Sequence, residues 1–139
     1  MVYVATTPEK RWNALIDSKM TTQYWQHENV SDWKPGSRWE HRRSDGKGTL
    51  DLVGQVVERS PPRRLVVSWA FPADEAHEEK HSRVTFLIEP HRDVERLTVT
   101  HDDLDAGSDM LAGITRGWPM VLSSLESLLE VGRPLLVLW

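Results

Sequence analysis

The fold is decided by residues 83–101, which read RVTFLIEPHRDVERLTVTH. Apolar and polar residues alternate on both sides of the turn residues 89–93. The first run gives one face to Val84, Phe86 and Ile88, and the second run does the same for Leu97, Val99 and His101. A period of two is typical of strands that bury one face. A short turn between two such runs predicts an antiparallel pair.

The same period extends upstream from this pair as far as residue 29. Four further strands are expected, at Val30–Trp33, Arg38–Arg42, Thr49–Glu58 and Leu65–Trp69. Turn residues separate them, namely Lys34-Pro35-Gly36, Ser44-Asp45-Gly46 and Ser60-Pro61-Pro62. The polar, acidic residues 72–80 form a loop. Consecutive strands joined by short turns predict an antiparallel meander.

Helical patterns flank the meander. Residues 1–6 form a short strand, and Thr6-Thr7-Pro8-Glu9 begins a helix that buries Trp12. Ser18 is expected to cap a second short helix through Met20, Tyr24 and Trp25. After residue 103 an apolar stripe predicts a long helix, with a break or kink near Gly117 and Pro119; its members are Trp118, Val121, Leu122, Leu125, Leu128 and Leu129. We expect one α+β domain over residues 1–139, with about seven curved strands around a C-terminal helix.

The composition excludes several kinds of chemistry. The chain has 139 residues, a formal charge of -4 and no cysteine. The absence of thiols excludes disulfides and cysteine-ligated metals. Interspersed charges offer no basic stripe to nucleic acid. No apolar run approaches the ~20 residues of a membrane span, and residues 1–7 lack signal-peptide features, so we expect a cytoplasmic protein.

The interior of this architecture is either packed or hollow. A sheet of about seven strands curls, and one helix about 10 Å wide covers only a strip of it. The chain has seven tryptophans against two phenylalanines and two tyrosines, and these rings could fill the space or line it. The inward set includes Trp69, Phe86 and Trp118, with His101 as its polar member.

A family resemblance spans nearly the whole chain. It rests on segments Ala5–Leu15, Lys34–Ser37, Gly54–Glu58, Pro61–Leu65, Ser82–Phe86, Leu97–His101 and Gly117-Trp118 before Leu122–Leu129. The sequence resembles the START-like helix-grip (SRPBCC) superfamily, within it the homologues of the heat-shock-protein-90 ATPase activator. The resemblance implies a cavity that holds lipids, sterols, polyketides or hormones, and in a few members a cyclase or related enzyme. The activator branch also implies a chaperone-associated role in stress response.

We therefore expect the protein to bind a small hydrophobic or aromatic ligand in an internal cavity. The candidate ligand residues are Trp25, Trp33, Trp39, His41, Trp69, Phe86, His101 and Trp118. For each tryptophan, plain packing is an equal alternative. His101 is either a core group or the group that orients a ligand's polar head. The other hypotheses are a chaperone-associated interaction domain and a cavity enzyme such as a cyclase or hydrolase. We expect no cofactor, no metal and no catalytic residue.

Three other motifs have plainer explanations. His77-Glu78-Glu79-Lys80-His81 matches the H-E-x-x-H zinc motif, but its surroundings lack the apolar stripe of a buried helix, so we expect a solvated loop. Asp102, Asp103 and Asp105 are expected to be loop and helix-cap residues rather than an acid–base pair. The apolar tail Leu135–Trp139 is expected to pack on the domain or to join a second copy in a homodimer.

Overall fold

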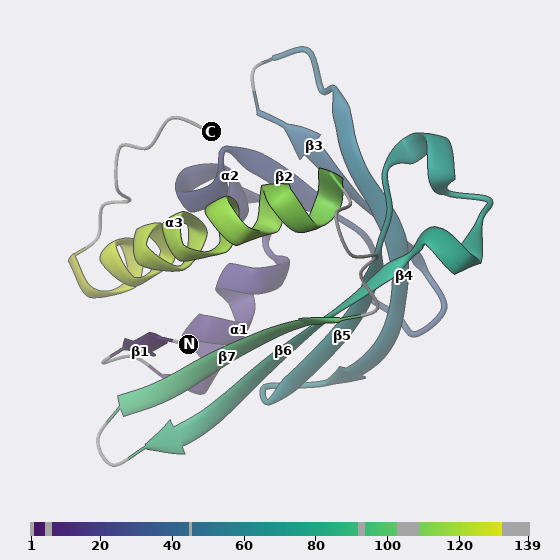
Figure 1. Cartoon of the computed structure of the whole chain (residues 1–139). Coiled ribbons are helices and arrows are strands. Elements are labelled where there is room, and N and C mark those ends of the chain that lie inside the picture. Colours follow the sequence, from purple (N-terminus) through teal and green to yellow (C-terminus); the bar gives the residue numbers. More distant parts are fainter. Residues whose placement is uncertain (1, 5–6, 45, 92–93, 103–108, 132–139) are drawn as a thin grey trace.

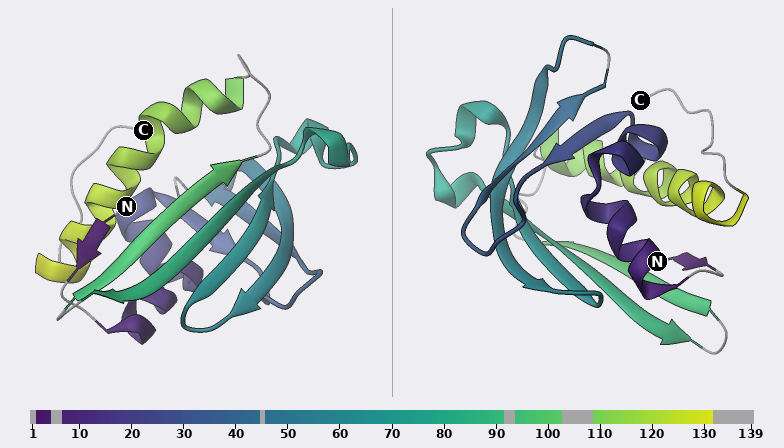
Figure 2. Two further views of the ribbon diagram at one scale, coloured as in Figure 1. Left: turned by 60° about the horizontal axis from the view of Figure 1, so that its bottom comes forward. Right: turned by 180° about the vertical axis from the view of Figure 1, so that it is seen from behind.

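The fold is a curved antiparallel sheet with three helices on one side (Figures 1 and 2). We describe residues 2–4, 7–44, 46–91, 94–102 and 109–131 of a computed structural model. The helices are α1 (Pro8–Ile16), α2 (Ser18–Trp25) and α3 (Asp109–Val131), and two short 3-10 turns are η1 (Pro72–Asp74) and η2 (Glu78–Lys80). The strands are β1 (Val2–Val4), β2 (His27–Val30), β3 (Arg38–Arg43), β4 (Leu50–Ser60), β5 (Arg64–Trp69), β6 (Ser82–His91) and β7 (Val94–Asp102).

The seven strands are ordered β1-β7-β6-β5-β4-β3-β2, and every pair is antiparallel. The predicted pair at residues 83–101 is confirmed, with Phe86 opposite Val99 and Ile88 opposite Leu97. Apart from the first strand, the order follows the chain, as a meander requires. The expected α+β helix-grip fold is therefore confirmed.

Local sequence signals begin both short helices. Thr7 caps α1, its hydroxyl accepting a hydrogen bond from the Lys10 amide at 3.2 Å. Asp17 caps α2, its carboxylate accepting from the Lys19 amide at 2.9 Å. Each cap satisfies a backbone donor that the helix itself leaves without a partner. Together they place Trp12 and Trp25 in the core beneath the sheet.

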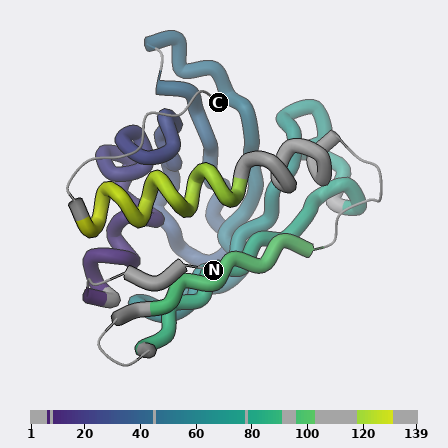
Figure 3. The backbone as a smooth tube through the Cα atoms, turned by 60° about the vertical axis from the view of Figure 1, so that its left-hand side comes forward, coloured from purple at the N-terminus to yellow at the C-terminus, as the bar shows by residue number. Residues whose placement is uncertain are grey.

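The long helix α3 crosses the concave side of the sheet, where it contacts α2 and β1 (Figure 3). Its predicted stripe is buried at Val121, Leu122, Leu125 and Leu128. Of the break or kink expected near Gly117 and Pro119, the break is wrong, because α3 is continuous through both residues. Core contacts of Trp118 and Val121, on either side of the proline, hold the helix together there. No helix in the described part of the chain is long and apolar enough to cross a membrane.

One predicted strand lies three residues too late in the sequence. The structure places β2 at His27–Val30 rather than at Val30–Trp33. Gln26 adopts a left-handed conformation with φ 58°, which ends α2 and turns the chain at once into β2. Trp33 has φ 59°, which is incompatible with an extended strand. This shift brings Asn29 onto the concave face, with consequences for the site.

Candidate functional site

All eight predicted site residues belong to one cluster of rings on the concave side of the sheet. The ring of Trp69 is central, since its centroid lies 5.9 Å from that of Trp39, 5.3 Å from Trp118 and 5.1 Å from His101. Trp25 contacts His41 at 4.6 Å. Trp33 joins the cluster through Trp39 at 6.3 Å, and Phe86 joins it through Trp118 at 5.9 Å. Their gathering in space agrees with the sequence analysis, although their role in binding stays a prediction.

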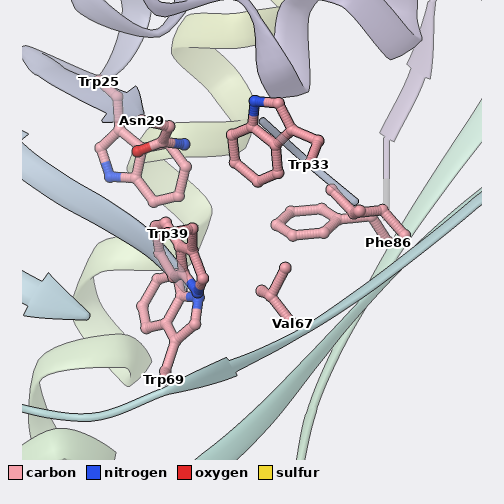
Figure 4. Close-up of a pocket in the computed structure, with 8 residues that line it drawn as sticks. Trp25, Asn29, Trp33, Trp39, Val67, Trp69 and Phe86 are labelled. Carbon is pink, nitrogen blue, oxygen red and sulfur yellow. The ribbon is translucent and has the colours of Figure 1, made fainter. Parts of the chain in front are cut away.

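A narrow pocket opens within this cluster (Figure 4). Its wall consists of Trp25, Asn29, Trp33, Trp39, Leu65, Val67, Trp69 and Phe86. The free volume is about 10 Å³, which is room for about one water molecule. In this conformation the rings themselves occupy most of the space beneath the sheet. The candidates His41, His101 and Trp118 stand behind this wall rather than on it.

Gly54 fixes the position of Trp39. A side chain at residue 54 would place its first carbon 1.7 Å from the Ser68 carbonyl oxygen and 2.6 Å from Nε1 of Trp39. Only glycine leaves room for that close approach. The indole N–H of Trp39 then donates to the Ser68 carbonyl at 2.8 Å. Trp39 is thereby held on the pocket wall by both packing and a hydrogen bond.

His41 anchors a buried polar group beside the pocket. Only 3% of its surface is exposed, and its Nδ1 donates to Oδ1 of Asn29 at 2.5 Å. Its ring stacks on that of His27 at 4.1 Å, with 3° between the planes. Burial, and then the neighbouring His27, lower the pKa of His41 well below its usual value. His41 is therefore neutral at physiological pH.

His27 connects this group to the protein surface. Its Nε2 bonds Asp51 at 2.8 Å, and its Nδ1 bonds the Trp25 carbonyl at 2.9 Å. Arg43 also donates to Asp51 at 2.8 Å. Burial alone would raise the pKa of Asp51, but the hydrogen bonds from Arg43 and His27 lower it overall. The ionised Asp51 thus holds His27, and His27 in turn supports His41 and Asn29.

His101 belongs to a second, closed network. The Trp118 indole N–H donates to Nδ1 of His101 at 3.2 Å, so His101 carries its proton on Nε2. That Nε2–H donates to the Ser82 hydroxyl at 2.7 Å, and the hydroxyl donates to the Trp69 carbonyl at 3.4 Å. Burial lowers the pKa of His101 to about 4, although Asp102 opposes the shift. Both ring nitrogens are engaged inside the protein.

Trp69 differs from the other polar groups of the cluster. It is 4% exposed, and its indole Nε1 is buried without a hydrogen-bond partner among the described residues. A buried donor in this state costs free energy, so such groups merit an explanation. Because Trp69 lines the pocket, an acceptor inside the pocket is one candidate partner.

Residues 5–130 match the family model described as activator of Hsp90 ATPase homolog 1-like protein. The chain belongs to this family. The family and its fold fit both ligand binding and Hsp90 activation. A search of curated proteins found no match to this family member.

Solved structures share the fold of this chain. The Aha1 dimer from Colwellia psychrerythraea is similar at TM-score 0.75 and 21% identity, with 94% of this chain and 93% of that chain covered. An HSP90 activator from Plasmodium falciparum is similar at TM-score 0.72 and 22% identity, covering 95% and 93%. CalU16 from Micromonospora echinospora is similar at TM-score 0.68 and 21% identity, covering 87% and 68%.

Sequence reasoning missed three residues of the polar network beside the pocket, namely Asn29, His27 and Asp51. Asn29 was hidden by the misplaced strand, since the predicted boundary left it in a loop. The alternation His27, Asn29 within β2 could have indicated two polar groups on one face. Asp51 gave no signal, because it lies among apolar residues at the start of β4 and pairs with a residue 24 positions away.

The H-E-x-x-H segment lies in the loop between β5 and β6. Residues 78–80 form a single 3-10 turn, too short to present two imidazoles on one helical face. Nε2 of His81 donates to the carbonyls of Asp74 and Glu75, at 3.2 and 3.0 Å, which closes the loop. Asp103, Asp105 and the apolar tail at 135–139 lie outside the described residues.

Proposed function

We propose that the protein binds a small apolar or aromatic molecule in the pocket bounded by Trp33 and Trp69. The supporting observation is the chemistry of the wall. Five of its eight residues are aromatic, two are aliphatic, one is an amide and none is charged. Such a wall, apolar with a single polar side chain beyond the indole N–H groups, is typical of sites for small organic ligands.

The ligand enters this site when Trp33 moves. Of the eight described residues that line the pocket, Trp33 alone lies outside a helix or strand. Its left-handed φ of 59° is costly for a residue with a side chain, by about 1–3 kcal/mol. The Ser31 hydroxyl accepts from its amide at 3.0 Å, and the turn at Gly36 follows. Displacement of this one ring would open a space the size of an indole.

Trp33→Gly tests the proposal, because it removes the ring and relieves the backbone. We expect the variant to bind indane, a bicyclic hydrocarbon of indole size, about tenfold or more tightly than the wild type, as measured by isothermal titration calorimetry. Trp33→Phe is the matched control, since it keeps a ring in the same place, and should stay close to the wild type. Absence of saturable indane binding to wild type and Trp33→Gly would contradict the proposal.

Native mass spectrometry of protein purified from its own host gives a second test. We expect a retained small molecule, close in mass to a bicyclic ring compound, that is lost on denaturation. The pocket wall offers no two facing titratable side chains, which is the feature that a cavity enzyme would need. Binding without turnover is therefore the form of the proposal that we favour.

A second candidate function is stimulation of a chaperone ATPase. The small free volume favours it, because a filled interior suits an interaction domain. One similar structure, from Plasmodium falciparum, is named as an HSP90 activator. The test is the ATPase rate of the host's Hsp90 with and without the protein. A several-fold increase that is equal for wild type and Trp33→Gly would support this candidate over ligand binding.

The homodimer expected through the tail at 135–139 stays a prediction, as do the single-domain organisation and the cytoplasmic location. A relative named as a dimer is compatible with self-association. Light scattering of the full chain and of a chain ending at residue 131 would test the role of the tail.

A further inference from the structure

Building on the proposed ligand site, we infer that its ligand is an uncharged ring compound that carries a hydrogen-bond acceptor, such as a ketone carbonyl, and that Trp69 and Asn29 orient it. Three properties of the pocket wall support this: its side chains are mostly hydrogen-bond donors, two of these donors lack a partner among the described residues or face the pocket, and no lining side chain is charged.

The side chains of the wall offer donors almost exclusively. Four of the eight are tryptophans, and an indole has an N–H donor and no acceptor. The wall contains one side-chain acceptor, Oδ1 of Asn29, and this atom already accepts from Nδ1 of His41. Leu65, Val67 and Phe86 are apolar. A ligand that meets this wall therefore finds N–H groups to accept from.

The indole N–H of Trp69 is a buried donor on the pocket wall that lacks a hydrogen bond among the described residues. The neighbouring Trp39, by contrast, already donates to the Ser68 carbonyl. Trp69 is held on β5 at the centre of the ring cluster, so its N–H is a rigid donor. An acceptor within reach would recover the hydrogen bond that burial has removed.

Asn29 supplies a second donor nearer to the movable side of the pocket. In Figure 4 its amide oxygen is turned toward Trp25 and its amide nitrogen toward Trp33. The oxygen is fixed by His41, which is supported by the stacked His27 and by Asp51. This chain of contacts holds the amide so that its NH₂ group faces the space that Trp33 would vacate.

The charge of the wall limits the ligand further. None of the eight lining side chains is charged. A carboxylate would exchange its hydration for neutral donors only. A cation is attracted by indole faces but offers no acceptor to the N–H of Trp69. A neutral carbonyl fits the donors without that loss.

The experiment compares two probes of the same shape, 1-indanone and indane, which differ by one carbonyl. Calorimetry gives the ratio of their dissociation constants in wild type and in Trp69→Phe, so that differences in probe hydration cancel. We expect the preference for 1-indanone relative to indane to fall about tenfold in Trp69→Phe, equivalent to about 1.4 kcal/mol. Trp12→Phe is the matched control, because Nε1 of Trp12 is also buried without a partner among the described residues but lies off the pocket wall.

A second measurement uses the wild-type protein alone, which removes any dependence on how a variant folds. In ¹H–¹⁵N spectra we expect 1-indanone to move the indole N–H resonance of Trp69 downfield, and indane to leave it without that shift. If both probes bind, and neither the ratio nor the Trp69 resonance distinguishes them, the inference about the acceptor is wrong while the proposed function stands. If neither probe binds to the wild type or to Trp33→Gly, the proposed function fails and this inference fails with it.

Discussion

His41 and His101 both contact the ring of Trp69, at 6.1 and 5.1 Å, yet their surroundings differ. Both ring nitrogens of His101 have partners, in a series of hydrogen bonds that runs from the Trp118 indole through Ser82 to the Trp69 carbonyl. Around His41 the network ends at Asn29, whose amide nitrogen faces the pocket. The difference indicates that the His101 network stabilises the fold, whereas the His41 network leaves the amide N–H groups of Asn29 able to bind a ligand.

The largest expected effect contrasts one tryptophan from each region. Trp39 is 2% exposed and donates to the Ser68 carbonyl, so Trp39→Ala should reduce the free energy of unfolding by about 3–5 kcal/mol. Trp118 is only partly buried, so Trp118→Ala should cost about half as much. Urea denaturation measures both. Equal losses would mean that the two tryptophans contribute equally to the free energy of unfolding.

A smaller effect is expected from breaking the closed network. Ser82→Ala leaves Nε2–H of His101 without its acceptor, which should reduce the free energy of unfolding by about 1–2 kcal/mol. Ser44→Ala is the control, because the Ser44 hydroxyl is exposed and makes only a 3.3 Å contact to Thr22. Urea denaturation should show almost no change for that control. A loss at Ser82 no larger than at Ser44 would contradict the scaffold role of His101.

The smallest effect is a change in pH dependence. The pKa of His41 is lowered in the folded state, and that of His101 falls to about 4, whereas an unfolded histidine titrates near about 6.5. Below about pH 6.5 the unfolded chain therefore binds protons that the folded protein does not, and stability falls as pH decreases toward the folded values. Above that pH the contribution is fully present.

The measurement is the free energy of unfolding at several values between pH 5 and pH 7, where carboxylates contribute little. We expect His41→Gln and His101→Gln each to flatten this dependence, because the pKa of both rings is lowered in the folded state. A dependence that neither substitution changes would show that the folded protein takes up protons at the same pH as the unfolded chain.

The sequence predicted the architecture well and the interior less well. Alternation at 83–101 and the hydroxyl cap at Thr7 are local signals, and both appear in the structure, whereas Asp17, not the expected Ser18, caps α2. The left-handed residues Gln26 and Trp33 gave no such signal, because neither is glycine or asparagine, the types that most often adopt this conformation. They shifted β2 and hid Asn29.

The site was predictable as a set of residues but not as a space. Alternation places Trp69, Phe86 and His101 on one face, so their meeting follows from the pattern. Whether the rings leave a cavity depends on their rotamers and on the pairing of Trp39 with Ser68, 29 residues away, which no periodicity encodes. The free volume of about 10 Å³ therefore could not be predicted from the sequence.

The indole cluster has an optical consequence. Trp25, Trp69 and Trp118 lie with ring centroids 5.3–6.0 Å apart, and Trp39 is 5.9 Å from Trp69. At such separations, excitation absorbed by one indole migrates to its neighbours before it is emitted. The tryptophan fluorescence of this cluster is thus shared among the four indoles. A quencher beside any one of them lowers the emission of all four.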